Sequence, residues 1–247
     1  MPDCLASVQW APEVIVVDDF SEDETPNICR SFSNVHYCAR ELDGFGFQKA
    51  HAVSLATNNW ILNIDADERV TDELKDEILS AVSAPDGYAG YKVRLKHFWF
   101  DTTHVDSYPG GLRLFKKDHG TFGPYYVHEK VDLEGEVGQL EQFLLHYPKS
   151  GENFSNYYEK YVLRYSPLVA KDYLARGQRV TPLNFCWKIV VIPLLVFLRD
   201  YLLKRKFTLG KIGFYVALCA AISYHRSYWY LFKLQCTREG AGSKAGR

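Results

Sequence analysis

One eleven-residue stretch constrains the fold more than any other: Trp60-Ile-Leu-Asn-Ile-Asp-Ala-Asp-Glu-Arg-Val70. Its apolar first half is short and partly β-branched, which is typical of a buried strand in an α/β sheet. Three carboxylates, Asp65, Asp67 and Glu68, follow directly. We expect them at the carboxyl end of the strand, where open α/β sheets bind ligands. Two aspartates separated by one residue can hold a hard cation through oxygen and present it to a phosphate.

The segments around this stretch alternate between strand and helix patterns, which predicts a parallel sheet with right-handed crossovers. An alternative interpretation of the three carboxylates is a polar turn that caps the next helix, since Thr71 followed by Glu73 is a typical helix start. The alternating segments are the strands 13–19, 34–38 and 60–64 and the helices after Pro26, at 48–57 and at 71–82.

A second strand of this series also ends in carboxylates. The strand pattern Glu13–Val17, which is apolar from Val14 onward, is followed by Asp18 and Asp19. Two acidic strand ends in one parallel sheet lie on the same rim of that sheet. Such a rim is typical of a site for a nucleotide and its metal, with one carboxylate for the base or ribose and the other for the metal and diphosphate.

Charge divides the chain into an acidic front and a basic back. Residues 160–247 hold 16 of the 29 lysines and arginines but 3 of the 30 aspartates and glutamates. Their formal charge is therefore +13, against −14 for residues 1–159. An acidic front argues against nucleic acid as a partner, whereas a basic, aromatic and apolar back favours the anionic face of a membrane. The alternative is a basic domain that docks on the acidic front.

The back half contains two apolar stretches, at 185–198 and 212–222, with cations and aromatic residues beside both. An amphipathic helix pattern at 153–175 precedes them. The first stretch is interrupted by Lys188 and Pro193, and it is too short for a membrane-spanning helix of about 20 residues. We therefore expect in-plane binding at a membrane surface, and the alternatives are burial against a partner subunit or a spanning helix.

These patterns predict an α/β domain over residues 1–150, a basic amphipathic helical region over 151–239 and a disordered tail over 240–247. The six cysteines include no C-x-x-C pair, and no signal peptide is visible. Both features favour reduced thiols in the cytosol.

Five blocks occur in order along the chain, and a tail motif, Phe197-Leu-Arg-Asp-Tyr-Leu-Leu-Lys-Arg-Lys-Phe, follows them. Together they resemble glycosyltransferase family 2, in its branch of lipopolysaccharide core β-1,4-glucosyltransferase-like proteins. The resemblance extends from about Leu5 to about Leu234. The five blocks are Glu13-Val-Ile-Val-Val-Asp-Asp-Phe-Ser-Glu-Asp-Glu-Thr, Gly44-Phe-Gly-Phe-Gln-Lys-Ala, Asn63-Ile-Asp-Ala-Asp-Glu-Arg-Val, Leu112-Arg-Leu-Phe and Val127-His-Glu.

The resemblance implies a GT-A fold, which is Rossmann-like with a mainly parallel sheet, and a C-terminal helical appendage that associates with the membrane. It also implies a nucleotide-diphosphate sugar donor, with UDP as the expected nucleotide, a Mg²⁺ or Mn²⁺ ion, and inversion at the anomeric carbon. Asp18 would contact the nucleoside, with Asp19 beside it. Asp65 would face the ribose or a metal-bound water, and Asp67 would bind the metal. Lys49 would take the place of a basic residue near the donor.

Transfer of a sugar needs a general base for the acceptor hydroxyl. We expect Glu129 to be this base, with His128 as the rival candidate. Arg113 is expected to pair with the diphosphate or, alternatively, with a carboxylate in the first half of the chain. His146 is expected to be structural.

The sequence therefore predicts transfer of a hexose, with glucose from UDP-glucose as the family-level expectation, to a lipid-linked saccharide such as lipopolysaccharide core. The expected location is peripheral, on the cytoplasmic face of the inner membrane. The family begins with a strand and an Asn-Glu-Glu-like turn that this chain lacks, so the alternative is an inactive, truncated scaffold. A nucleotidyltransferase is disfavoured because no glycine-rich phosphate loop lies near the start.

Overall fold

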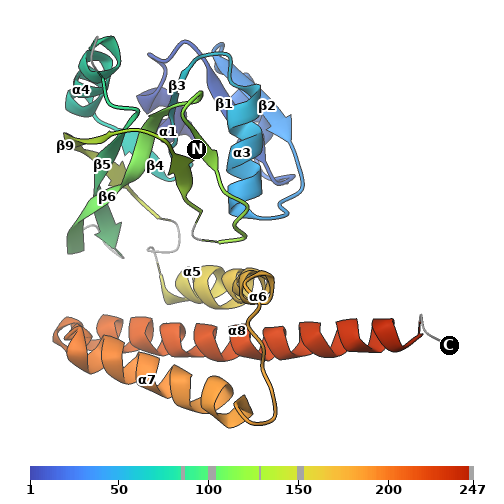
Figure 1. The fold of residues 1–247 in the computed structure, drawn as a ribbon. Coiled ribbons are helices and arrows are strands. Elements are labelled where there is room, and N and C mark those ends of the chain that lie inside the picture. The colour runs from blue at the N-terminus through green and yellow to red at the C-terminus, as the bar shows by residue number, and fades with distance from the viewer. Residues whose placement is uncertain (85–86, 100–103, 128, 149–152, 245–247) are drawn as a thin grey trace. The chain divides into compact units, whose positions relative to one another are not determined.

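In the computed structural model the chain forms two compact units, Met1–Glu152 and Asn153–Arg247. The structure describes residues 1–84, 87–99, 104–127, 129–148 and 153–244. The elements of the first unit are α1 (Pro2–Ser7), β1 (Val14–Asp18), α2 (Thr25–Arg30), β2 (Val35–Ala39), α3 (Phe45–Leu55), β3 (Trp60–Leu62), β4 (Glu68–Val70), α4 (Asp72–Ser83), β5 (Gly90–Trp99), β6 (His104–Lys116), β7 (Gly120–Phe122), β8 (Val131–Leu133) and β9 (Val137–His146), coloured from blue to green in Figure 1.

The front of the first unit follows the predicted alternation of strands and helices, which confirms the α/β class. β1 and β2 pair in parallel, from Val14 opposite Val35 to Asp18 opposite Ala39, and α2 connects them. α3 then leads to β3, which is three residues long and half-buried rather than a fully buried strand. The acidic residues after β3 therefore follow a short strand, as the sequence predicted. β1 and β3 belong to different sheets, however, so the expectation that both acidic strand ends share one rim of a parallel sheet was wrong.

The larger sheet is mixed, which corrects the expectation of a mainly parallel sheet. Its five strands run in the order β3-β6-β5-β9-β4. β5 and β9 pair in parallel, whereas the pairs β3–β6, β5–β6 and β4–β9 are antiparallel. A parallel neighbour requires a crossover of about a dozen residues or more. The link from β5 to β9 meets this requirement, because β6, β7 and β8 come between them in the sequence. β3 and β4 lie at opposite edges of the sheet, and each pairs antiparallel with a later strand, β3 with β6 and β4 with β9.

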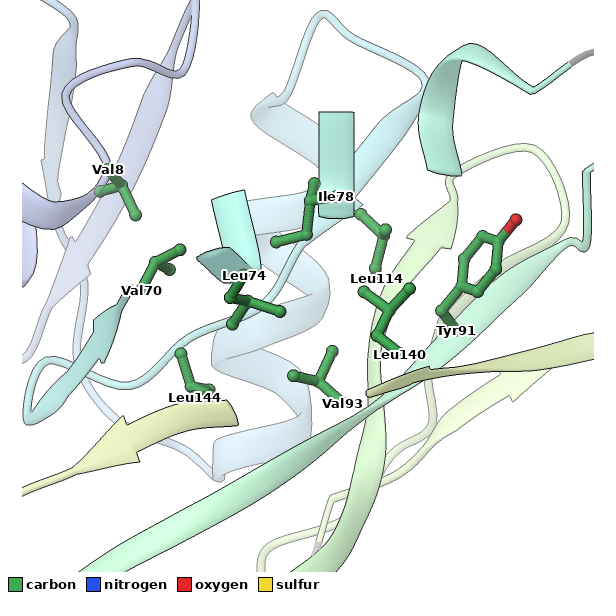
Figure 2. Packing of buried hydrophobic residues seen from close by; sticks show 9 residues of the cluster. All are labelled: Val8, Val70, Leu74, Ile78, Tyr91, Val93, Leu114, Leu140 and Leu144. Carbon is green, nitrogen blue, oxygen red and sulfur yellow. The ribbon is translucent and has the colours of Figure 1, made fainter. Parts of the chain in front are cut away.

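The core of the first unit lies between α4 and this sheet (Figure 2). Leu74 and Ile78 face the sheet from the helix, and Leu144 faces them from β9; all three are almost fully buried. Thr71 caps the helix, since its hydroxyl oxygen accepts a hydrogen bond from the Leu74 amide at 3.2 Å. The predicted helix start at Thr71 is thus confirmed.

The start of the chain is attached to β4, the strand that follows the acidic loop. Asp3 of α1 pairs with Arg69 at 2.6 Å, and the Val70 amide donates to the Ser7 hydroxyl oxygen at 3.1 Å. Cys4 and Leu5 are buried beneath these contacts. The α1 helix therefore supports the acidic loop from one side.

The second unit is helical in the part that the structure describes. Its main core contains Ala170, Ile189, Tyr228 and Leu231. The α8 helix continues to Lys244, and residues 245–247 of the tail predicted to be disordered lie outside the described residues. The elements are α5 (Phe154–Tyr158), η2 (Glu159–Arg164), α6 (Tyr165–Ala175), η3 (Trp187–Val191), α7 (Ile192–Leu198), η4 (Arg199–Leu203), η5 (Lys206–Leu209) and α8 (Gly210–Lys244).

Candidate active site

The first acidic strand end, at β1, is occupied by hydrogen bonds of its own turn. The Asp18 carboxylate is buried and accepts from the Ser21 amide at 2.8 Å, the Ser21 hydroxyl at 2.6 Å and the Tyr37 hydroxyl at 2.9 Å. Burial alone raises the pKa of Asp18, but these hydrogen bonds lower it by more. The neighbouring Asp19 accepts from the Leu42 amide at 2.9 Å. Both aspartates shape this loop, and their predicted contact with a nucleoside stays a prediction.

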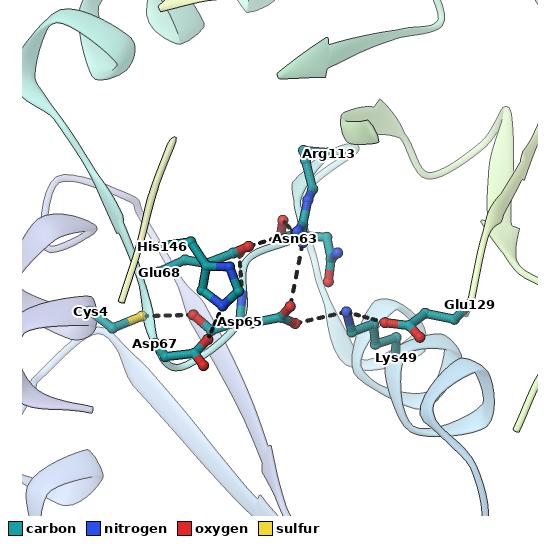
Figure 3. A network of polar contacts seen from close by, with 9 residues as sticks. All are labelled: Cys4, Lys49, Asn63, Asp65, Asp67, Glu68, Arg113, Glu129 and His146. Carbon is teal, nitrogen blue, oxygen red and sulfur yellow. Dashed lines mark hydrogen bonds and ion pairs between the residues drawn. The ribbon is translucent and has the colours of Figure 1, made fainter. Parts of the chain in front are cut away.

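The second acidic strand end lies at the centre of a charged network (Figure 3). Asp65 lies 2.8 Å from the Lys49 amine and 3.8 Å from the Arg113 guanidinium. Burial alone raises the pKa of Asp65, but Lys49 and Arg113 lower it to about 2. Asp65 is therefore ionised at neutral pH. Arg113 pairs with carboxylates of the first half of the chain, as the alternative prediction for it stated.

Lys49 connects the acidic loop to Glu129, the candidate base. Its amine lies 2.8 Å from Asp65 and 2.6 Å from a Glu129 oxygen. Burial lowers the pKa of Lys49, but both carboxylates raise it by more, so the amine is protonated. The structure thus brings together Lys49, Asp65 and Glu129, which lie far apart in the sequence. His128, the rival base, lies outside the described residues.

The glycine-rich start of α3 explains how Lys49 reaches this position. The Phe45 amide donates to the Tyr126 carbonyl at 3.1 Å, and the Gly46 amide donates to the Tyr125 carbonyl at 2.9 Å. A Cβ atom on Gly46 would lie 2.3 Å from the Gly123 carbonyl oxygen, so only glycine permits this approach. The first turn of α3 therefore packs directly on the loop that leads to Glu129.

Glu68 is a site residue that the sequence reasoning missed. It is fully buried, and its two oxygens accept from Arg113 at 2.7 Å and from the Asp65 amide at 2.7 Å. Burial raises the pKa of Glu68 to about 7, although Arg113 opposes the rise. Glu68 thus fixes both the backbone of the acidic loop and the guanidinium above it. The alternation of side chains along a strand could have indicated its burial, because Glu68 and the buried Val70 lie on the same face of β4.

Asp67 turns to the other side of the loop, toward the end of β9. Its carboxylate lies 3.4 Å from Nε2 of His146, a residue we expected to be structural. β9 pairs with β4 so that His146 lies opposite Glu68, and the His146 ring meets the His97 ring edge to face at 4.3 Å. Among the described residues, Nδ1 of His146 is buried and has no hydrogen-bond partner. The pair Asp67–His146 is thus held in place by sheet register.

The Asp67 carboxylate is a ligand that both Mg²⁺ and Mn²⁺ accept, and the His146 imidazole is one that Mn²⁺ accepts. No group of three or more His, Cys, Asp or Glu side chains that could hold a metal occurs in the described part of the chain. Mg²⁺ is commonly bound by one or two carboxylates together with substrate phosphates and waters, so a two-residue site fits this use. Cys4 lies nearby and donates to the Asp65 carbonyl at 3.6 Å. Burial raises the pKa of the Cys4 thiol to about 12, so the thiol is protonated at neutral pH in this structure.

The arrangement places the Asp67–His146 pair and two cations close together. Asp67 and His146 lie on one side of the acidic loop, and Lys49 and Arg113 lie on the other. Two partly buried cations next to this pair suit a diphosphate, whose negative oxygens are stabilised by positive charge. Glu129 lies on the far side of Lys49, and its expected role as the general base stays a prediction.

Comparisons with known proteins show which proteins this chain is similar to. Residues 1–122 match the family model of Glycosyl transferase family 2. The chain is 26% identical over 228 residues to a lipopolysaccharide core biosynthesis glycosyltransferase, LpsC, of Rhizobium meliloti, covering 89% of this chain and 82% of that protein. It is 29% identical over 220 residues to an uncharacterised glycosyltransferase of Rickettsia prowazekii, covering 82% and 71%. Among solved structures, S. aureus TarS 1–349 in complex with UDP-GlcNAc has a TM-score of 0.47 at 12% identity, covering 96% of this chain and 87% of that one.

Proposed function

We propose that the chain transfers a hexose from a UDP-sugar to a lipid-linked saccharide. Two findings are the premise: residues 1–122 are a glycosyltransferase family 2 domain, and the chain is a glycosyltransferase of GT-A fold. Glucose is the sugar we favour, and lipopolysaccharide core is the acceptor we favour. The observation that supports this proposal most is the network in which Lys49 joins Asp65 of the acidic loop to Glu129. That network unites the donor and acceptor residues predicted from the sequence.

On the donor side, Asp67 and His146 are the residues that would hold a Mg²⁺ or Mn²⁺ ion. When bound, such an ion neutralises charge on a diphosphate leaving group. Lys49 and Arg113 add two further positive charges in the same region. Asp65, which those cations keep ionised, holds both of them in place before a donor arrives and is our candidate for contact with the ribose.

On the acceptor side, Glu129 is the proposed general base. The acceptor hydroxyl oxygen attacks the anomeric carbon, the bond from that carbon to the diphosphate oxygen breaks, and the hydroxyl proton passes to a Glu129 oxygen. One displacement inverts the anomeric configuration. Lys49 lies 2.6 Å from Glu129, so it orients the carboxylate in the resting site. Movement of Lys49 toward a bound diphosphate would release Glu129 to accept the proton.

Relatives and composition support a lipid-linked acceptor. The name of the Rhizobium meliloti relative places that protein in lipopolysaccharide core biosynthesis. In the described part of this chain, one helix, Lys206–Thr237, is long and apolar enough to cross a membrane. The basic second half of the chain favours a peripheral position on the anionic, cytoplasmic face of the inner membrane.

Glu129→Gln tests the proposal most directly. We expect the variant to bind UDP-glucose with Mn²⁺ as wild type does and to lose transfer by a factor of about 10²–10⁴, the range for a general base. Glu136→Gln, on an exposed side chain of the same unit, is the matched control and should transfer normally. Normal transfer by Glu129→Gln would contradict the assignment of the base, and no transfer by wild type with any UDP-sugar would contradict the proposed reaction.

A further inference from the structure

One helix of the second unit exposes an apolar surface to solvent. The opposite side of the same helix packs against the core of the second unit. This helix is the continuous run of η3, α7 and η4, residues 187–203. Its inward residues Ile189, Pro193, Val196 and Asp200 are buried at a spacing of three or four residues. Its outward residues are large, apolar and 39–79% exposed, and together they are called the apolar face: Trp187, Val190, Leu194, Leu195, Leu198, Leu202 and Leu203.

The solvent side of a surface helix is ordinarily polar, so this face is unusual. Contiguous exposed apolar patches mark interaction sites for proteins or membranes. A groove of about 450 Å³ runs along the C-terminal part of the apolar face. Its lining is aliphatic except for one charged residue, Arg199. An aliphatic groove beside a single guanidinium fits a molecule with a hydrocarbon chain and an anionic head.

Cations gather where this helix ends, and one buried carboxylate organises them. Asp200 is 5% exposed, and its oxygens lie 2.7 Å from Arg199, 3.0 Å from Lys204 and 3.9 Å from Lys206. These three cations are called the basic cluster. Their side chains remain 46%, 55% and 27% exposed, so all three are in contact with solvent. Asp200 is the one acidic residue in the sequence from 187 to 211.

Two occupants would cover such a face, a second copy of the chain and an anionic membrane leaflet, and charge distinguishes between them. A second copy of the chain, meeting this face around a two-fold axis, would present the same cations and no further carboxylate. An anionic leaflet offers hydrocarbon to the apolar face and phosphates to the basic cluster at once. The combination therefore favours a phospholipid surface.

The packing of α8 favours a position in the plane of the leaflet rather than across it. Arg226 lies within the apolar helix 206–237 and donates to the Val162 carbonyl of η2 at 3.2 Å. The neighbouring His225 contacts the Ile189 carbonyl through Nδ1 at 2.8 Å. These polar contacts join α8 to η2 and to the helix of the apolar face. A spanning α8 would place Arg226 in hydrocarbon, which is costly.

We propose that the apolar face and the basic cluster form a membrane-binding surface that lies in the plane of an anionic phospholipid leaflet. The apolar face enters the acyl region, and Arg199, Lys204 and Lys206 contact lipid phosphates. The inference deepens the proposed function, and it rests on that function for one point, that the lipid-linked acceptor is met at this surface.

Co-sedimentation with vesicles of two compositions tests the inference on the purified full chain. One set contains phosphatidylcholine alone, and the other contains phosphatidylcholine mixed with phosphatidylglycerol. We expect wild type to prefer the anionic vesicles. Lys204→Gln with Lys206→Gln leaves Asp200 paired with Arg199 and should weaken that binding about thirtyfold, since each cation near the surface contributes about fivefold.

A second variant tests the apolar face. Leu194→Glu with Leu198→Glu should lower binding to the anionic vesicles by more than tenfold, because burial of each leucine in hydrocarbon is lost. The matched control is Leu79→Glu, at a leucine of the first unit with 42% exposure, which should bind vesicles as wild type does. An unchanged melting temperature shows that each variant is folded.

Three results would overturn the inference. Binding of wild type to neither vesicle, or equal binding to both compositions, contradicts the proposal that the basic cluster contacts lipid phosphates. A Leu194→Glu/Leu198→Glu variant that binds vesicles normally but has lost a stable dimer identifies a second copy as the occupant. Resistance of the bound chain to extraction by alkaline carbonate indicates a spanning helix. By contrast, a chain that binds vesicles but transfers no sugar contradicts only the proposed function.

Discussion

Replacing Arg113 by methionine should destabilise the protein strongly at alkaline pH and weakly at acidic pH. Arg113 donates to the fully buried Glu68 at 2.7 Å, so Arg113→Met leaves an ionised carboxylate in the core without its closest cation. Removing one partner of a buried ion pair costs about 3–5 kcal/mol. For a unit of this size each kcal/mol lowers the melting temperature by about 2–4 °C, so we expect a decrease on the order of 10 °C.

The pH dependence follows from the pKa of Glu68, which burial raises from 4.5 to about 7. The folded protein then binds this proton more tightly than the unfolded chain does. The stabilisation from the protonated group is complete below a pH of about 4.5 and is lost as the pH rises through about 7. Without Arg113 the pKa of Glu68 rises further, so the variant continues to lose stability above pH 7, where wild type does not.

Scanning calorimetry at about pH 5 and about pH 8.5 measures both effects. The control is Arg94→Met, because Arg94 pairs with Glu141 at 3.3 Å on the surface, where such a pair contributes about 0–1 kcal/mol. An equal loss for Arg113→Met at both pH values, or an alkaline loss no larger than that of the control, would refute the reasoning.

Three further predictions concern single residues of the first unit. Thr71→Ala removes the acceptor for the Leu74 amide and should cost about 1 kcal/mol of unfolding free energy, measured by urea titration. Glu13 accepts hydrogen bonds from Thr57 and Asn58, which outweigh the effect of burial and lower the pKa of Glu13 to about 2. The stability that the ionised Glu13 contributes is present above its ordinary pKa and is lost as the pH falls toward about 2. Glu13→Gln should therefore reduce the dependence of the unfolding free energy on pH in the acid range. His146→Ala should weaken Mn²⁺ binding in the presence of UDP by about tenfold or more, measured by calorimetric titration.

The front of the fold was predictable because its signals are local. Strand patterns ending in aspartates and the cap at Thr71 each depend on a few neighbouring residues, and the structure confirms them. The pairing of the larger sheet was not predictable in this way. Strand direction there depends on pairing between strands far apart in the sequence: β3 pairs with β6, and the late strand β9 inserts between β5 and β4. The sequence shows the length of a link but not the partner that a distant strand will choose.

The same distinction applies to the site. Asp65, Lys49 and Glu129 were selected one at a time, and the structure brings them within hydrogen-bond distance. Glu68 was missed because an acidic residue in an acidic turn ordinarily faces water. Its burial depends on Arg113, which β6 supplies 45 residues later. His146 approaches Asp67 only because β9 pairs with β4, so its distance from Asp67 could not be read from the sequence.

A thermal-shift panel tests whether Asp67 and His146 form a metal-dependent nucleotide site. The panel compares five nucleotides, each with and without Mn²⁺: UDP, GDP, ADP, CMP and dTDP. It uses wild type, Asp67→Asn and a control at an exposed residue, Asp76→Asn. A ligand that binds the folded state raises the melting temperature of the protein. We predict a Mn²⁺-dependent shift with UDP in wild type and Asp76→Asn, and no such shift in Asp67→Asn. A shift that is independent of Mn²⁺, or no shift with any nucleotide in a chain that melts cooperatively, would contradict the claim, and the second result would favour the inactive scaffold.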